Sequence, residues 1–516
     1  MKSKMKFLAI LVVAVFCLGL LLAGCANGKT PSSSTSNTPA GTKPAAQPAE
    51  EEISNIIMSF TSNTPEEVGR IEAAINKITE PEIGVHLNLV VWEIGSYLSN
   101  FSLAITGGEV IDIVRVAPIN PLATMIAQKQ IMEVNDLFTT YAPGALEVCG
   151  SFADAYRSNG GLYGLPTYRL LQNNGYAILR KDILQECGVL DVAENCKTWS
   201  DLETIFAAVN GYCKENHMYV IGGAKYLMTP KYLCGDGENF DKGYVSPGIG
   251  ENTALVRLED NKAILSWEDP IMVQFCKRFN SWNEKGWVWP ETPYNEDFGD
   301  TLMKNSVVFG YLDDSEFGVE KAKLNATGYE VVTPQFATGS IASESLTMFG
   351  VAVGITSANP VGAAKFINMM YTDARICNLF AWGEEGVDYT INSEGEMIYP
   401  GNDIKNAKYR GADYALGNQF LCLPTQGQGG DFRTVAKAVN DAAPVSEYMG
   451  FLINPDGLDT LIASLSAVKD EYQVSLVCGL YTDDLYNEFI TKLNNVGMQD
   501  YLTEVQKQLD AFLAKK

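Results

Sequence analysis

Histidine is scarce in this chain: its 516 residues include only two, His86 and His217. The sequence contains no His-Glu-x-x-His pattern, no Gly-x-Ser-x-Gly elbow and no kinase or dinucleotide-binding pattern. Because imidazole is the commonest side-chain ligand of catalytic transition metals, we expect no transition-metal site, and the missing patterns predict no cofactor. The sequence points away from metalloenzymes and nucleotide-dependent enzymes.

Basic residues are also few, with 38 Lys and Arg against 62 Asp and Glu, for a net charge of −24. Residues 1–24 hold three lysines and no acid, so the chain without them carries three fewer positive charges, or −27. A surface of this sign repels phosphate backbones and anionic lipids. We therefore expect no nucleic-acid partner.

Paired cysteine motifs are missing. Of 11 cysteines, nine remain after Cys17 and Cys25; none forms Cys-x-x-Cys, and an odd number cannot all pair within one chain. Several fall on predicted inward helix faces, where a thiol acts as a small apolar side chain. We expect mostly free thiols, with a disulfide framework as the alternative.

Long apolar runs are confined to the N-terminus. Three lysines precede the run Phe7–Leu22, and Leu-Ala-Gly leads to Cys25. This is typical of a secretory signal peptide, and its ending resembles a bacterial lipobox. We expect residues 1–24 to be a lipoprotein signal peptide, with an uncleaved membrane anchor as the alternative. Cys25 is then the lipidation site at the outer face of the cell membrane, and residues 25–52 are a flexible tether.

Strand and helix patterns alternate from residue 53. Strands are expected over residues 53–60, 85–92 and 111–116. Thr64, Pro65 and Glu67 predict a capping box at the helix that follows the first strand. Parallel sheets of this kind gather ligands at the carboxyl ends of their strands. The candidate ligand-binding residues at these ends are Ser62, Asn63, Trp92, Arg115 and Asn120.

A second α/β pattern follows a glycine-rich segment at residues 160–166. The expected elements are a strand at 175–179, a helix at 182–187, a helix capped by Thr198 or Ser200, a helix at 270–282, strands at 306–311 and 348–355, and a helix at 361–370 capped by Asn359. The strand at 306–311 leads into the predicted loop Leu312-Asp313-Asp314.

The stretch 160–209 resembles the hinge-crossing segment of family 1 extracellular solute-binding proteins, the lipoprotein receptors of ABC importers. There a Gly-Leu-Pro segment enters the second lobe through a strand that ends in Lys-Asp, and a Thr-Trp-x-x-Leu helix follows. The run Trp382-Gly-Glu-Glu-Gly-Val-Asp-Tyr389 and the chain from Gly450 onward resemble the LplA-like subgroup. The resemblance implies an α/β, two-lobe, periplasmic-binding-protein-like (type II) fold with hinge strands. The implied division is 53–170 and 347–449 for lobe 1 and its cleft loops, 171–346 for lobe 2, and 450–516 for a helical C-terminal region.

The same resemblance completes the candidate site. Polar ligand contacts are implied at Arg169 and Asn173, and the loops aimed at the cleft supply Tyr168, Tyr311, Asp313, Trp382 and Glu384. Sugars pack their C–H faces on aromatic rings, while their hydroxyls need polar partners. The implied function is capture of a carbohydrate, an oligosaccharide in this subgroup, and its delivery to the transmembrane subunits of an ABC permease by a monomeric receptor.

Several alternatives stay open at this point. Arg169 has the alternative of an ion pair with an acid on the cleft rim. The many acids permit a secreted glycoside hydrolase, which needs only two carboxylates, although no enzyme is expected. A non-transporting sensor or adhesin lipoprotein is a third possibility, and peptides are an alternative ligand class. A calcium loop at residues 236–241 is left open.

Overall fold

The computed structural model describes residues 53–223, 254–257 and 259–515. The predicted signal peptide, Cys25, the tether and the 236–241 loop lie outside these residues. Within the described ranges, no helix combines enough length with enough apolar character to span a bilayer. Two five-stranded sheets organise the described chain, and we call each sheet with its helices a lobe.

The first sheet contains the predicted parallel strands. Strand β1 pairs in parallel with β2 and β3, and β14 runs antiparallel between β3 and β6. The order is β2-β1-β3-β14-β6, with β1 (Ser54–Phe60), β2 (Val85–Val91), β3 (Ile113–Val116), β6 (Leu165–Pro166) and β14 (Gly350–Val353). The chain leaves this sheet after β6 and returns to it at β14, as the family resemblance implies.

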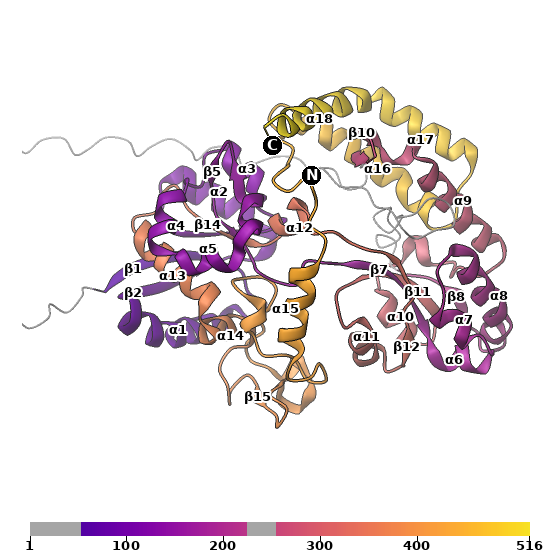
Figure 1. Ribbon diagram of the computed structural model, residues 1–516, viewed down its shortest axis with the longest axis horizontal. Helices are drawn as coiled ribbons and strands as arrows, with labels where there is room; N and C mark the ends of the chain where they lie inside the picture. The colour runs from indigo at the N-terminus through magenta and orange to yellow at the C-terminus, as the bar shows by residue number, and fades with distance from the viewer. Residues whose placement is uncertain (1–52, 224–253, 258, 516) are drawn as a thin grey trace, which may run out of the picture. The chain divides into compact units, whose positions relative to one another are not determined.

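Amphipathic helices cover the first sheet (Figure 1). They are α1 (Val68–Ile83), α2 (Tyr97–Gly107), α3 (Leu122–Ala127), α4 (Asn135–Tyr141), α5 (Pro143–Cys149), α12 (Ser343–Thr347), α13 (Pro360–Thr372) and α14 (Ala374–Trp382). Helix α13 is capped as predicted, because the Asn359 side chain accepts from the Gly362 N–H at 2.9 Å. The capping box predicted at Thr64 is wrong. Residues Pro65–Glu67 form a 3-10 turn, and the Thr64 hydroxyl instead accepts from the Arg410 N–H at 3.2 Å.

The second sheet is built on β7, which pairs antiparallel with β11, β12 and β13, while β11 runs parallel to β8. Its strands are β7 (Asn174–Arg180), β8 (Tyr219–Ile221), β11 (Val308–Ser315), β12 (Val331–Val332) and β13 (Gln335–Ala337). Strand β11 extends through the predicted loop, and Asp313 pairs in register with Tyr176. That part of the prediction is wrong, because the hydrogen bonds to β7 continue past Tyr311.

Both faces of the second sheet are covered. Ala177 and Leu179 of β7 belong to a large apolar core, and Tyr176 and Ile178 belong to a smaller one on the other face. The helices of this lobe are α6 (Lys181–Glu186), α7 (Leu190–Glu194), α8 (Trp199–Glu215), α9 (Pro270–Glu284), α10 (Gly299–Lys304) and α11 (Val319–Thr327). The hairpin of β9 (Ala254–Arg257) and β10 (Lys262–Leu265) lies beside them. Thr198 caps α8 in a capping box, as predicted.

Segments of the chain cross between the sheets after β6, between β13 and β14, and again beyond α15 (Phe432–Ala442). The first two meet at Gly339, where a Cβ atom would stand 1.8 Å from the Asn173 carbonyl oxygen. Only glycine allows this approach, so the paired hinge segments depend on it. A bridge between Ile341 and Val445 joins the second and third crossings.

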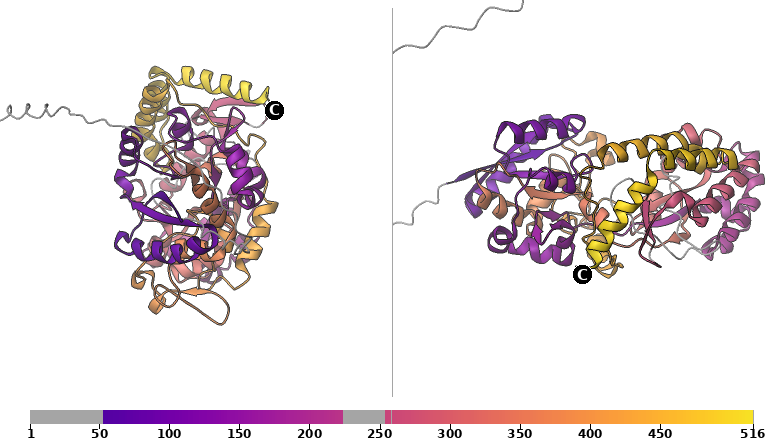
Figure 2. Two further views of the ribbon diagram at one scale, coloured as in Figure 1. Left: turned by 90° about the vertical axis from the view of Figure 1, so that its left-hand side faces the viewer. Right: turned by 90° about the horizontal axis from the view of Figure 1, so that it is seen from above.

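The C-terminal helices pack against lobe 2. They are α16 (Asp459–Val477), α17 (Asp483–Asn495) and α18 (Met498–Leu513). Phe489 of α17 meets the buried ring of Trp267 edge-on at 5.1 Å, and Leu476 and Leu509 lie in the same large core. Figure 2 shows these helices, in yellow, beside the elements of lobe 2. They therefore extend the lobe 2 core.

The described cysteines are free thiols, as predicted. Eight of them lie within the described residues, none is disulfide-bonded there, and all but Cys187 are buried. Burial raises the pKa of these thiols; that of Cys196, for example, rises to about 11. They act as small apolar core residues.

Candidate functional site

A cavity of about 530 Å³ lies between the two lobes, and we call it the cleft cavity. The crossing segment contributes Leu170 and Asn173 to its wall. Lobe 2 contributes Asp300, Tyr311, Asp313, Asp314, Glu316 and Lys323, and the chain that packs beside lobe 1 contributes Trp382, Asp413, Tyr414, Gln419, Phe432 and Arg433. A ligand in this cavity would contact both lobes.

The lobe 2 wall is an ordered set of charges around Tyr311. The Tyr311 ring is 1 % exposed, and its hydroxyl donates to Asp300. Lys323 on α11 places its Nζ 2.5 Å from Asp313 and 3.2 Å from Asp300. Burial and the Asp300 carboxylate raise the pKa of Tyr311, so its hydroxyl remains a donor. One lysine thus balances two carboxylates on this wall.

The opposite wall is fixed by Asp413. Arg433, buried at the start of α15, forms an ion pair with this carboxylate, and the Gln419 amide donates to it at 3.1 Å. The Gln419 carbonyl oxygen in turn accepts from the Leu170 N–H of the crossing segment at 2.9 Å. Asp413 is therefore held in place through side chains that also fix the hinge.

Arg169 joins the hinge to the cavity. Its guanidinium lies 3.6 Å from Glu316, donates to the Leu170 carbonyl oxygen at 2.8 Å and lies over the Phe349 ring at 5.7 Å. Burial raises the pKa of Glu316 to about 7, Asp413 adds to the rise, and Arg169 opposes it. The ion pair weighed for Arg169 in the sequence is therefore present.

Aromatic rings complete the walls. Phe317 of lobe 2 and Phe432 of α15 stack across the cleft with centroids 5.8 Å apart and planes 30° apart. Trp382 meets Tyr399 edge-on at 6.3 Å, and no described residue accepts a hydrogen bond from its buried indole N–H. Phe298 is 55 % exposed at the rim. The walls of the cleft cavity therefore carry both aromatic rings and carboxylates that can accept hydrogen bonds from hydroxyl groups.

A smaller cavity of about 190 Å³ lies at the carboxyl ends of β1 and β3, and we call it the arginine cavity. Thr61, Ser62 and Asn63 after β1, Arg115 of β3, and Arg410 line it. Tyr414 lines both this cavity and the cleft cavity, so the two are neighbours. Residues that follow β1 and a residue of β3 thus line one cavity.

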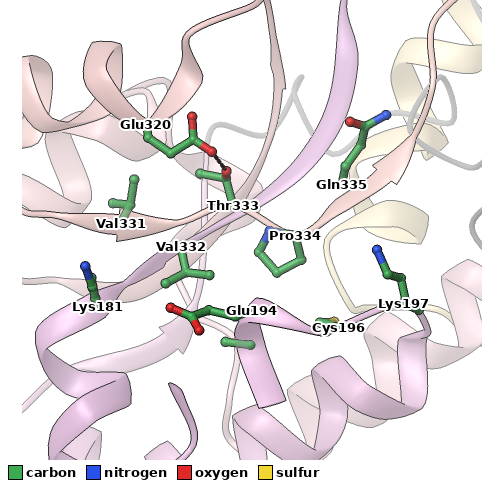
Figure 3. A pocket seen from close by; sticks show the side chains of 11 residues that line it. Lys181, Glu194, Cys196, Lys197, Glu320, Val331, Val332, Thr333, Pro334 and Gln335 are labelled. Atoms are coloured by element: carbon green, nitrogen blue, oxygen red, sulfur yellow. Dashed lines mark hydrogen bonds between the residues drawn. The ribbon is translucent and has the colours of Figure 1, made fainter. Parts of the chain in front are cut away.

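A third cavity, of about 390 Å³, shares no lining residue with the other two among the described residues. Figure 3 shows it around the turn at Thr333 and Pro334. Thr333 donates to Glu320 at 2.6 Å, and lysines and glutamates are mixed along its wall. None of the predicted site residues lies there, so we do not include it in the candidate site.

The predicted site residues separate into three groups. Asn173, Tyr311, Asp313 and Trp382 line the cleft cavity. Ser62, Asn63 and Arg115 line the arginine cavity. Trp92, Asn120, Tyr168, Arg169 and Glu384 line neither cavity within the described chain.

The members of the third group have other partners. Trp92 packs edge-on against Tyr97 at 5.4 Å, and the fully buried Asn120 donates to the Arg115 carbonyl oxygen at 3.3 Å. Two more are held by charged side chains: the Tyr168 hydroxyl donates to Asp441 at 2.5 Å, and Glu384 pairs with Arg70 at 2.7 Å. Arg169 does not line the cleft cavity itself but forms an ion pair with Glu316, which does. These contacts are structural.

Sequence reasoning missed Asp300, Glu316, Lys323, Asp413, Gln419, Phe432 and Arg433, all of which line the cleft cavity. One local signal was available, since Asp-Ser-Glu-Phe continues directly from Asp313 at the end of β11. The others come from α10, α11 and the 411–433 segment, which only tertiary packing brings together. No group of three or more His, Cys, Asp or Glu among the residues described is arranged to hold a metal ion.

Comparison with known proteins agrees with this fold. Residues 447–514 match the family described as "Domain of unknown function (DUF3502)". A "Carbohydrate ABC transporter substrate-binding protein" of Streptococcus pneumoniae serotype 4 is 20 % identical over 528 residues, which cover 100 % of each chain. The crystal structure of the N-glycan transport solute binding protein (NgtS) of Streptococcus pneumoniae superposes with a TM-score of 0.75 at 17 % identity, over 90 % of this chain and 100 % of that one. For the S. pneumoniae binding protein FusA in complex with kestose, the TM-score is 0.58 at 16 % identity, over 90 % and 100 % of the two chains.

The fold is therefore that of two-lobe solute-binding proteins, and the predicted fold class is confirmed. In sequence the chain resembles a protein named as an ABC transporter substrate-binding protein, and in fold it resembles solute-binding proteins.

Proposed function

We propose that this protein captures a carbohydrate in the cleft cavity and delivers it to the transmembrane subunits of an ABC permease. The observation that carries the proposal is the composition of the cavity wall: carboxylates and aromatic rings face one space from both lobes. Relatives support the ligand class, since the names of NgtS and of the FusA complex refer to an N-glycan and to kestose.

The wall matches the chemistry of a sugar. Hydroxyl groups donate to carboxylates such as Asp313 and Asp413, and the C–H face of a pyranose packs on a ring such as Trp382. Asn173 and Tyr311 add an amide and a phenol that fix orientation. An oligosaccharide fits this arrangement because Tyr414 lines both the cleft cavity and the arginine cavity, so a ligand that extends past Tyr414 would contact both.

Closure supplies the transport signal. A ligand that contacts Asp313 on lobe 2 and Asp413 on the opposite wall gains part of its binding energy only when both walls are in place. Binding therefore favours the closed arrangement of the lobes, and the permease recognises that arrangement. The protein binds and does not catalyse, in line with relatives that are named as binding proteins.

The remaining features belong to the same proposal. Cleavage before Cys25 and lipidation of that residue tether a monomeric receptor to the outer face of the membrane through residues 25–52. The proposed lobe boundaries are 53–170 with 347–449 for lobe 1 and its cleft loops, 171–346 for lobe 2, and 450–516 for the C-terminal helices. Helix α12 is an exception and belongs with lobe 1, because its Leu346 lies in the core of the first sheet.

The test is a thermal-shift screen of residues 26–516 against a panel of neutral and acidic oligosaccharides and of peptides, followed by calorimetric titration of the hits. Asp313→Asn and Asp413→Asn each remove a charged acceptor, so each should weaken glycan binding about 10-fold or more. Asp154→Asn is the matched control, because this carboxylate is 56 % exposed at the surface. Stabilisation by peptides but by no glycan, or parent-like affinity in both cleft variants, would overturn the proposal.

A further inference from the structure

The arginine cavity has the opposite charge to the rest of the protein. Among the described residues that line it are Arg115 and Arg410, and none is an Asp or Glu. The chain as a whole has 62 acids against 38 bases, and the neighbouring cleft cavity is lined by more carboxylates than cations. The described charged residues that line this cavity are therefore all positive, although the chain as a whole is strongly negative.

Arg115 is a buried cation with few partners. Its residue is 9 % exposed, its Nη1 donates to the Thr61 hydroxyl, and its guanidinium lies over the Phe60 ring at 5.8 Å. Its buried Nε has no hydrogen-bond partner, and the guanidinium forms no ion pair with any carboxylate in the described part of the chain. The buried Nε of Arg410 likewise lacks a partner among the residues described.

Acids on the chain that borders this cavity are committed elsewhere. Asp388 forms a two-pronged pair with Arg70, at 2.9 Å on each side, and also accepts from the Tyr409 N–H at 2.9 Å. Glu384 pairs with the same Arg70. These side chains position the cavity wall but leave the charge of Arg115 uncompensated.

An unpaired buried guanidinium is costly, and proteins normally pair it with an acid. The planar fork of arginine matches a carboxylate, which it can bind through two parallel hydrogen bonds. We infer that the arginine cavity binds the carboxylate of an acidic sugar residue, such as a uronic or sialic acid, at one end of the glycan. This inference rests on the proposed function: the remaining sugar residues occupy the cleft cavity, and Tyr414 stands where the two spaces meet.

Neutral groups fit the same role. The Ser62 hydroxyl and the Asn63 amide follow β1 and line the cavity beside Thr61, where they can bind ring hydroxyls next to the carboxylate. The receptor would then distinguish an acidic glycan from a neutral one of the same linkage. Selection would come from the charge of Arg115, because a neutral ligand leaves that guanidinium unpaired.

The experiment compares matched ligands by calorimetry: a glucuronate-bearing xylo-oligosaccharide, 3′-sialyllactose and the other acidic members of the panel, each beside its carboxyl-reduced form. Residues 26–516 should bind at least one acidic glycan about 10-fold or more tightly than the reduced form. Arg115→Gln should lose about 10- to 100-fold for that acidic glycan and less than about 3-fold for its reduced form. Arg115→Lys, which keeps the charge without the planar fork, should give an intermediate loss.

Two controls separate recognition from folding. Arg157→Gln makes the same charge change at a surface ion pair, where the arginine side chain is 41 % exposed, and should leave both affinities unchanged. The unfolding temperature of Arg115→Gln without ligand should not fall, because a buried unpaired charge is removed. Equal loss on both ligand forms, or a marked fall in that temperature, would make Arg115 a structural residue and overturn the inference.

The other outcomes are also decisive. If neutral glycans bind and no acidic glycan binds more tightly than its reduced form, the acidic-sugar inference fails and the proposed function stands. If no glycan of either kind binds, the proposed function itself fails, and the inference with it.

Discussion

Gly299→Ala is expected to disrupt the lobe 2 wall of the cleft cavity. A Cβ atom at this position would stand 2.2 Å from Cγ and Cδ2 of Tyr311, whereas ordinary contacts lie at 3.4–4 Å. The backbone at Gly299 is not in the left-handed region, so the effect is purely steric. The Tyr311 ring must shift by about 1 Å or more from a site in which it is 1 % exposed and tied to Asp300.

Overpacking of this kind costs about 1–3 kcal/mol of unfolding free energy. Because Tyr311 lines the cavity, glycan affinity should fall by about 10-fold as well. The matched control is Gly211→Ala in α8, where no described heavy atom lies within 4 Å of the new Cβ; it should stabilise the protein by about 0.5–1 kcal/mol through helix propensity. Urea denaturation and calorimetric titration measure both effects. If Gly299→Ala kept the stability and the affinity of the parent, the close packing of Gly299 against the Tyr311 ring described here would be wrong.

Three further outcomes are expected. Glu316 has a pKa raised to about 7 and a side chain that is 38 % exposed, so the folded state binds the extra proton between about pH 4.5 and 7. The stability of the parent relative to Glu316→Gln should therefore fall as the pH rises through that window, by on the order of 1 kcal/mol in urea denaturation; a constant difference would contradict this. Lys323→Met leaves the Asp313 carboxylate without its cation and should lower the free energy of unfolding by about 3 kcal/mol. The control Lys277→Met breaks an ion pair whose lysine side chain is 54 % exposed and should lower it by less than about 1 kcal/mol. Equal losses in the two variants would show that the ion pair in the cleft is solvated. Trp382→Ala should lose about 3–5 kcal/mol of stability because Trp382 is only 6 % exposed. Trp382→Phe keeps an aromatic ring in the core and is therefore the suitable variant for measuring binding. An alanine variant as stable as the parent would show that the ring lies outside the core.

Local patterns predicted the elements well, because local chemistry decides them. The capping box at Thr198 forms as read, since the Thr198 and Asp201 side chains satisfy backbone groups within the same turn. The box at Thr64 does not form, because a loop more than 300 residues away supplies the Arg410 N–H as a competing donor. A capping pattern in sequence carries no information about such a competitor.

The cleft was predictable only in part, for a related reason. Tyr311 and Asp313 lie on one strand of a recognisable α/β pattern, so their placement follows from topology. Asp413 lies in an irregular segment and Arg433 lies at the start of α15, and no local pattern shows that the two side chains meet beside the hinge. Tyr168 shows the converse: it stands beside the hinge in sequence, but its ring packs edge-on against Phe420, and it does not line the cleft cavity.

The most direct test of the account is a crystal structure of residues 26–516 with the tightest-binding glycan of the panel. The account predicts the glycan in the cleft cavity, with hydroxyls donating to Asp313 from lobe 2 and to Asp413 from the opposite wall, and with a sugar ring packed on an aromatic face. A glycan bound outside the cleft, or held by one lobe alone while the other wall stays empty, would contradict it.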